Sequence, residues 1–153
     1  MANIAFNIAK GRAVELYNRV KSNDPANSAL IIVPIETSGL ESDATLIDKE
    51  DLAAVLSGTT NEQTTMGRKT LTDSDLAAFP APDHANNRYD ISLPTTTWAG
   101  ASGNAISKLL VCYDPDTTAG TDSSIIPVSL FDFAQTPSGA DIQMTGAVFY
   151  RAS

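Results

Sequence analysis

The residue pattern best suited to chemistry is a polar loop in the second half of the chain. Aspartate or threonine occupies positions 114, 116, 118 and 122, and glycine occupies position 120. Alternating oxygen ligands followed by a glycine are typical of a calcium loop. The match is poor, because the glycine comes one position late and Ile125 stands where a bidentate glutamate is needed. Since aspartate and threonine are also common in hairpin loops, we expect an ordinary loop from Asp114 to Asp122, with calcium binding as the alternative.

Nucleophilic or zinc chemistry would have to use the single histidine and the single cysteine. His84 lies in a proline-flanked loop, and no nucleophile motif surrounds it. Cys112 lies inside an apolar run, where a free thiol behaves as a small hydrophobic side chain. One cysteine and one histidine are too few for the usual zinc site, and neither common glycine-rich phosphate loop is present. We therefore expect no catalytic residue, no metal, no cofactor and no enzymatic activity.

The composition describes an acidic protein of ordinary hydrophobicity. The 153 residues carry a formal net charge of −8, and 42% of them are hydrophobic. Nucleic acids and anionic membranes bind basic surfaces, so neither is expected as a partner. The N-terminus lacks the pattern of a signal peptide, and no window approaches the roughly 18 apolar residues of a membrane span. The sequence predicts a single soluble domain, residues 1–153, made in the cytoplasm.

Two apolar runs joined by a polar loop predict the centre of the fold. Residues 106–113 are almost continuously apolar, and residues 125–133 are rich in β-branched and aromatic side chains. Both patterns are typical of strands, and the loop between them predicts an antiparallel pair. The other predicted elements are a helix over about 7–20, strands over 28–35, 68–71, 88–94 (which residues 95–98 can extend beyond a bulge) and 142–150 (with a candidate bulge at Gly146), and short helices over 48–58 and 73–78. This order predicts an α+β fold with a mostly antiparallel β-sheet, sandwich or barrel-like, one N-terminal helix and two short helices.

The first eight residues support two interpretations. Ile4, Phe6 and Ile8 alternate with Ala5 and Asn7, which suits an extended arm. Three large apolar side chains exposed on a free arm would be a liability, so an arm predicts contact with a neighbouring subunit. Alternatively, these side chains pack on the chain's own sheet or begin the first helix. Residues 1–8 are thus a candidate N-terminal arm, and Ile4, Phe6 and Ile8 are candidate interface residues.

Four stretches, spread over nearly the whole chain, carry a family resemblance. They are residues 5–12 (AFNIAKGR), 18–31 (NRVKSNDPANSALI), 68–73 (RKTLTD) and 108–116 (KLLVCYDPD). With these stretches the chain resembles a family of small proteins of tailed bacteriophages that are found with the structural genes of the virion. The stretches look like packing and turn motifs, so the resemblance implies no catalytic residues. In size and character the chain is most similar to capsid decoration (cement) proteins.

The resemblance implies a virion structural protein, a decoration subunit bound without covalent chemistry to the major capsid protein on the capsid exterior. We expect a homo-oligomer, with a trimer favoured, at a local symmetry axis. An acidic protein suits the outside of a shell better than its DNA-lined inside. Contacts are expected from residues 2–8 and from loops rich in threonine and serine. The alternatives are a neck or tail component, such as an adaptor, and, less favoured, a hydrolase-like enzyme.

Overall fold

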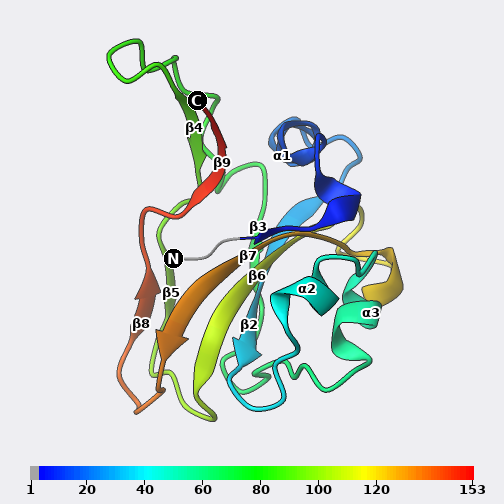
Figure 1. The fold of residues 1–153 in the computed structure, drawn as a ribbon. Helices are drawn as coiled ribbons and strands as arrows, with labels where there is room; N and C mark the ends of the chain where they lie inside the picture. Colours follow the sequence, from blue (N-terminus) through cyan, green and yellow to red (C-terminus); the bar gives the residue numbers. More distant parts are fainter. Residues whose placement is uncertain (1–3) are drawn as a thin grey trace.

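A five-stranded antiparallel sheet runs through the protein in the computed structural model, which describes residues 4–153 (Figure 1). In spatial order its strands are β1 (Ile4–Ala5), β7 (Ile126–Gln135), β6 (Ile106–Asp114), β2 (Ala29–Glu36) and β3 (Lys69–Leu71). The predicted central pair is confirmed, because β6 and β7 are neighbours with Leu110 opposite Leu130. The predicted α+β class with mostly antiparallel strands is confirmed as well, and the described strands form no closed barrel.

Both faces of this sheet are covered, which explains why its inner strands are almost continuously apolar. Successive side chains of a strand point to opposite faces. Leu30 and Ile32 of β2 therefore belong to one buried cluster, whereas Ile31 and Val33 belong to the other. In β6, Val111 belongs to the first of these clusters, and its neighbours Leu110 and Cys112 belong to the second. The sheet is thus the middle layer between two hydrophobic cores.

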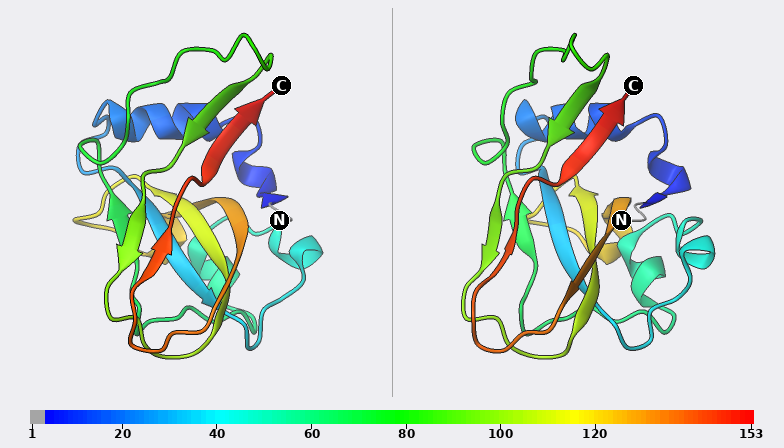
Figure 2. Two further views of the ribbon diagram at one scale, coloured as in Figure 1. Left: turned by 90° about the vertical axis from the view of Figure 1, so that its left-hand side faces the viewer. Right: turned by 60° about the vertical axis from the view of Figure 1, so that its left-hand side comes forward.

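The first core lies between the sheet and a layer made of one helix and two short ribbons (Figure 2). The layer contains α1 (Ala13–Lys21), the ribbon of β5 (Thr96–Trp98) with β8 (Ile142–Met144), and the ribbon of β4 (Tyr89–Ser92) with β9 (Val148–Ala152). Trp98 is almost fully buried here, and its indole N–H donates to the backbone oxygen of Gly67 at 2.9 Å. The β4–β9 ribbon extends beyond the rest of the molecule and carries the C-terminus (Figure 1).

The second core lies between the other face of the sheet and two short helices, α2 (Asp43–Leu46) and α3 (Leu52–Leu56). Leu46, Leu52 and Val55 supply the helical side of this core. Asp51 begins α3, because its carboxylate accepts a hydrogen bond from the backbone N–H of Ala54 at 2.7 Å, as an N-cap residue does. The predicted helix over 48–58 is therefore shorter than expected.

Helix positions differ from the predictions in two further places. The first helix begins at Ala13 and not near Asn7, because a 3-10 turn over Asn7–Ala9 precedes it and Gly11 adopts a φ of +78° between them. The predicted short helix over 73–78 is wrong. The carboxylate of Asp75 instead accepts hydrogen bonds from the backbone N–H and the hydroxyl of Thr72, which holds this segment as a turn.

The predicted last strand is divided into two strands that belong to different ribbons. Gly146, at a φ of +63°, separates β8 from β9. β8 pairs with β5, and β9 pairs with β4. The backbone N–H of Leu93, between β4 and β5, donates to the carbonyl of Ala147 at 2.8 Å. This bond joins the two segments at the point where β8 ends and β9 has not yet begun. No helix among residues 4–153 is long and apolar enough to cross a membrane.

Candidate functional site

The candidate interface residues of the N-terminus lie against the chain's own sheet. Ile4 faces Leu130 in the β1–β7 pair, and the backbone N–H of Phe6 donates to the carbonyl of Val128 at 3.0 Å. The side chain of Phe6 has no exposed surface and belongs to the second core, against which Ile4 and Ile8 also pack. From Ile4 onward the segment is therefore no free arm, and Phe6 is not available to a partner. Met1, Ala2 and Asn3 of the predicted arm lie outside the described residues.

Cys112 and His84 are far apart in the fold and in different environments. Cys112 is fully buried in the second core, and burial raises the pKa of its thiol far above the ordinary value. His84 lies on the exposed loop at the far end of the β4–β9 ribbon. The structure therefore does not bring the two side chains together. Among residues 4–153, no three His, Cys, Asp or Glu side chains are grouped so that they could hold a metal ion.

A buried, protonated thiol should not react. We expect thiol reagents to label native Cys112 no faster than the protein unfolds, because the sulfur has no solvent contact. The Cys112→Ala and Cys112→Val variants should fold at a cost of about 1 kcal/mol, since each is a small change in volume. Labelling kinetics followed by mass spectrometry test this prediction, and rapid labelling of the native protein would contradict it.

The carboxylates of the 114–122 loop face separate partners. Asp114 accepts a hydrogen bond from the backbone N–H of Asp116 at 3.0 Å. Asp116 in turn accepts bonds from the backbone N–H and the hydroxyl of Thr118, and these bonds lower the pKa of its carboxyl group. Both contacts are typical of aspartate in turns. Asp122 is directed to Arg68 instead. The carboxylates thus shape the loop. Asp114, Asp116 and Asp122 line one small pocket together with Arg68, but among residues 4–153 they are not grouped so that they could hold a metal ion.

This arrangement favours an ordinary loop over a calcium site. We expect excess chelator to leave the melting temperature of the purified protein unchanged, because the described loop is already held by internal hydrogen bonds. A thermal melt with and without EDTA measures this. A decrease of several degrees that calcium reverses would contradict the expectation, since a ligand that binds only the folded state raises its stability.

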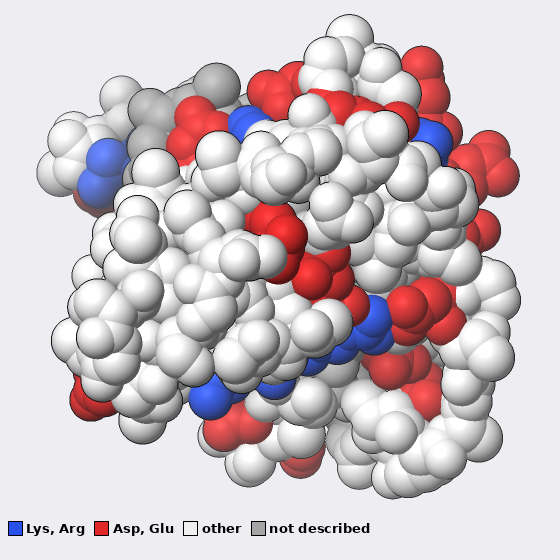
Figure 3. Space-filling model, turned by 90° about the horizontal axis from the view of Figure 1, so that it is seen from below, with Lys and Arg blue, Asp and Glu red and all other residues white. Residues whose placement is uncertain are grey.

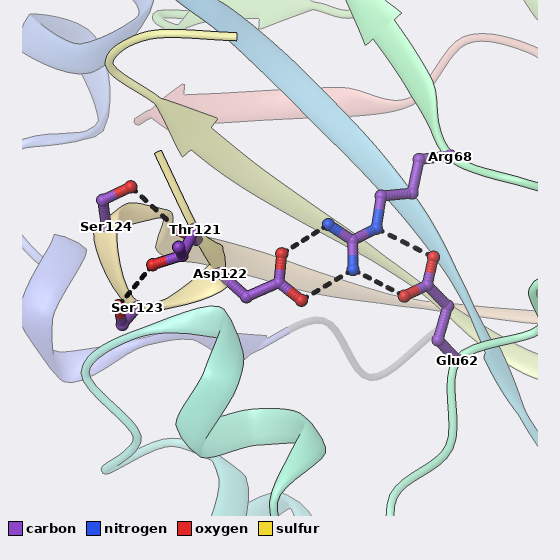
Figure 4. Close-up of polar contacts among 6 residues, drawn as sticks. All are labelled: Glu62, Arg68, Thr121, Asp122, Ser123 and Ser124. Atoms are coloured by element: carbon purple, nitrogen blue, oxygen red, sulfur yellow. Dashed lines mark hydrogen bonds and ion pairs between the residues drawn. The ribbon is translucent and has the colours of Figure 1, made fainter. Parts of the chain in front are cut away.

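Arg68 forms the most extensive polar cluster near this loop (Figure 4). Its Nη2 and Nε lie 2.6 and 2.8 Å from the two carboxylate oxygens of Glu62. Its Nη1 and Nη2 lie 2.7 and 2.8 Å from those of Asp122. The bonds to Asp122 and then to Glu62 raise the pKa of Arg68, and the guanidinium lowers the pKa of Asp122. The sequence does not predict this cluster, which connects the segment before β3 to the loop between β6 and β7.

A second ion cluster attaches α2 to the sheet. Lys108 of β6 is 9% exposed, and its Nζ lies 2.6 Å from Asp132 of β7 and 3.1 Å from Asp43 of α2. Burial alone would lower the pKa of Lys108, but the two carboxylates more than compensate and raise it. All the charges in this cluster have opposite charges beside them. Like the Arg68 cluster, it holds elements of the fold together.

The surface around β5 and β8 differs from the rest of the molecule by its lack of charge. Charged residues make up 18% of the chain, yet residues 91–107 contain none and residues 133–150 contain only Asp141. The carboxylate of Asp141 accepts a hydrogen bond from the backbone N–H of Gly100 at 2.8 Å. In Figure 3 this region is the largely white left-hand part of the molecule. We call the exposed residues of segments 92–104 and 134–146, apart from Asp141, the neutral surface.

The neutral surface is folded into a continuous ribbon. Thr97 and Gln143 are exposed on adjacent strands, and the Gln143 side-chain amide donates to the Thr97 hydroxyl at 3.0 Å. Beyond the strands, the backbone N–H of Gly139 donates to the carbonyl of Ala101 at 2.7 Å, which joins the two loops. Charged residues are depleted at the centres of protein–protein interfaces, so such a surface fits a contact role. Both charge-poor stretches can be read in the sequence. That threonine- and serine-rich loops make contacts with a partner stays a prediction.

An apolar groove borders the neutral surface between β7 and the β8–β9 segment. Its volume is about 330 Å³. Leu109 and Phe131 lie on the sheet side of the groove, and Met144 and Val148 lie on the other. Phe133, which is only partly buried, also lines it. The groove therefore opens onto side chains of the first core.

No protein-family model, no curated protein and no solved structure matches this chain. The fold and the described site define an α+β protein with two polar clusters that hold its parts together. They also define a charge-poor surface beside an apolar groove.

Proposed function

We propose that this chain is a structural subunit of a tailed-bacteriophage virion, a decoration or cement protein that stabilises the capsid by non-covalent contacts with the major capsid protein. The family resemblance carried by the four sequence stretches supports the assignment to a tailed-bacteriophage virion. The neutral surface is the observation that carries the contact role. It gathers exposed Thr, Ser, Gly, Ala and Gln side chains on one ribbon of an otherwise acidic protein.

The distribution of charge also supports a position on the outside of the shell. The net charge of −8 opposes binding to packaged DNA, whereas a neutral contact surface avoids the cost of desolvating charges. Non-covalent attachment depends on the area buried across several subunits and not on reactive groups. Contact through a homo-oligomer, with a trimer favoured, would increase that area for each attached particle.

Binding to undecorated capsids tests the proposal directly. The purified chain should cosediment with capsids that lack it, and Thr97→Lys should weaken this binding, because it places a charge in the middle of the neutral surface. Asn18→Lys is the matched control, since Asn18 is exposed on α1, which lies away from the β5–β8 ribbon (Figure 1). Equal binding by the two variants would refute a contact role for the neutral surface.

Copy number distinguishes a decoration protein from a neck or tail component. Quantitative mass spectrometry of purified virions should find hundreds of copies if the chain covers the shell. About a dozen copies or fewer would place it in the neck or tail, and absence from virions would refute a structural role. Sedimentation velocity of the free chain measures whether it forms the expected trimer.

A further inference from the structure

A pocket separate from the apolar groove lies on the first-core side of the sheet, between β7, β9 and the segment that leads into α1. Its volume is about 300 Å³. Ala9 and Ala13 line it from the helical side, and Val128 and Phe149 line it from the two strands. A volume of this size lies at the lower end of the range for pockets that bind small molecules, and such pockets are also lined mainly by apolar side chains.

The buried hydroxyl of Ser129 distinguishes this pocket. Ser129 is 7% exposed and lines the pocket, and its Oγ has no hydrogen-bond partner among residues 4–153. A β-bulge turns the residue to this side of the sheet, because Val111 pairs with Ser129 and Cys112 pairs with Pro127, which leaves Val128 as the extra residue. Buried polar groups nearly always have a partner, since a group without one destabilises the fold. The Ser129 hydroxyl can therefore pair with a ligand in the pocket.

The charged side chains that line the pocket are basic. They are Lys10 and Arg151, and no described Asp or Glu lines it. Arg151 makes two hydrogen bonds of 2.7 Å to Asp90, so its charge is already compensated. Lys10 donates to the side-chain oxygen of Asn7 at 2.6 Å, and this partner is a neutral amide. In a chain with a net charge of −8, such a lining favours an anionic ligand.

The N-terminal end of α1 favours an anion as well. Gly11 and Ala13, at the start of this nine-residue helix, line the pocket. The first N–H groups of a helix have no partner within the helix, and they stabilise negative charge. The acid of the first turn, Glu15, lies 3.3 Å from Arg12 and 2.8 Å from Arg19 and does not line the pocket. The helix end therefore acts in the same direction as Lys10.

We propose that this pocket binds a small carboxylate with an apolar body, such as hexanoate. The apolar body lies against Val128 and Phe149. The carboxylate accepts a hydrogen bond from the Ser129 hydroxyl and faces Lys10 and the start of α1. A hydrogen bond to an ionised acceptor is stronger than one between neutral groups, so the carboxylate is preferred over an uncharged ligand of the same shape. The inference goes beyond the proposed function and does not use the neutral surface.

Titration of the full chain with sodium hexanoate, followed by backbone amide NMR signals, tests the inference. The signals of residues 9–13, 128–129 and 149–151 should shift and saturate, with a dissociation constant of about 1 mM or lower for a ligand of this size. Hexanamide preserves the shape and removes the charge, so it should bind at least about tenfold more weakly. The inference would be overturned by a lack of saturable shifts at about 10 mM hexanoate, by shifts confined to other elements, or by equal binding of hexanamide.

Two substitutions connect hexanoate binding to the pocket. Ala13→Leu fills the pocket with a side chain that favours helices, so it should abolish binding. Ser129→Ala should weaken binding about tenfold, and the melting temperature should not fall, because the hydroxyl that it removes has no described partner.

Ser107→Ala is the matched control, since the Ser107 hydroxyl donates to Thr37 Oγ1 at 2.7 Å and Ser107 does not line the pocket. It should bind hexanoate like the unchanged chain and should lower the melting temperature. Unchanged binding by Ser129→Ala or Ala13→Leu would overturn the inference. A greater loss of stability in Ser129→Ala than in Ser107→Ala would also overturn it, because the hydroxyl would then have a partner.

The same chemistry is present at the C-terminal residue of a peptide, so a tripeptide that ends in leucine with a free carboxylate is titrated beside hexanoate. Tighter binding of the tripeptide than of hexanoate would overturn the assignment to a small carboxylate and identify a chain terminus as the ligand. The capsid experiment is separate from both titrations. A chain that binds hexanoate but not capsids would refute the virion role and leave the pocket assigned, and the reverse result would refute the pocket alone.

Discussion

Replacing Phe6 with alanine is expected to lower the free energy of unfolding by about 3–5 kcal/mol, the usual cost of truncating a buried aromatic side chain. The phenyl ring has no exposed surface and fills the second core between the sheet and the short helices. Its removal leaves a cavity that the backbone cannot easily close, because the N–H groups of Phe6 and Asn7 bond to Val128 and Ile47. Chemical denaturation followed by circular dichroism measures the loss.

Phe79 provides the matched control. It is the exposed large hydrophobic residue of the described chain, with 39% of its surface accessible. Its main aromatic contact is with Tyr17, at a centroid distance of 5.5 Å. Phe79→Ala should therefore cost about 1 kcal/mol or less. Equal losses for the two variants would contradict the burial of Phe6 and restore the interpretation of residues 4–8 as an arm that binds a partner.

The sequence predicts the fold best where hydrophobic pattern and burial agree. The continuous apolar runs of β2 and β6 indicate strands with both faces covered, and both lie inside the sheet. A proline inside a strand usually indicates an edge or a bulge, because it has no N–H to donate, and β2 contains Pro34. It lies beyond the last residue that pairs with β3, and its carbonyl accepts from Gln63 on that side. The missing N–H of proline therefore costs no bond to β6, since both groups of a residue in an antiparallel strand point to the same side.

A local sequence pattern gives a wrong prediction where its side chains form other hydrogen bonds than those of a helix cap. The stretch from Thr72 to Leu76 resembles a helix start. The carboxylate of Asp75, however, accepts hydrogen bonds from the backbone N–H and the hydroxyl of Thr72, and the segment forms a single turn. The alternation of Ile4, Phe6 and Ile8 is equally compatible with an arm and with a short strand. Only the position of β1 beside β7 distinguishes the two, and that depends on contacts more than 120 residues away in the chain.

The polar clusters and the groove could not be predicted for the same reason. Arg68 is 54 residues from Asp122, and no spacing rule connects them. The groove forms where β7 and the β8–β9 segment separate, which depends on the break at Gly146 and on the pairing of two ribbons. The neutral surface, in contrast, can be predicted in part from the sequence. Its two charge-poor stretches are visible in the sequence, although only the β5–β8 pairing shows that they form one surface.

The second large effect is expected at Arg68. Arg68→Met preserves the aliphatic stem but removes the guanidinium that bonds two carboxylates. Glu62, whose side chain is 12% exposed, and Asp122, 36% exposed, would then face each other without a counter-charge. Breaking a fully buried pair costs about 3–5 kcal/mol, and partial solvent access reduces this to about 2 kcal/mol here. Denaturant titration measures the difference between the variant and the unchanged chain.

Arg151→Met is the matched control for this effect, because Arg151 also forms a two-bond contact, with Asp90, but its side chain is 48% exposed. That substitution should destabilise the fold much less than Arg68→Met does, because exposed ion pairs contribute little to stability. The effect of Arg68→Met should also depend on pH. Arg68 lowers the pKa of folded Asp122, so the stabilisation is present above the unfolded value of about 4 and is lost as the pH falls through the folded pKa. If the two arginine variants lose equal stability, or if the Arg68 effect is as large in strong acid as at pH 7, the contacts of Arg68 do not stabilise the fold.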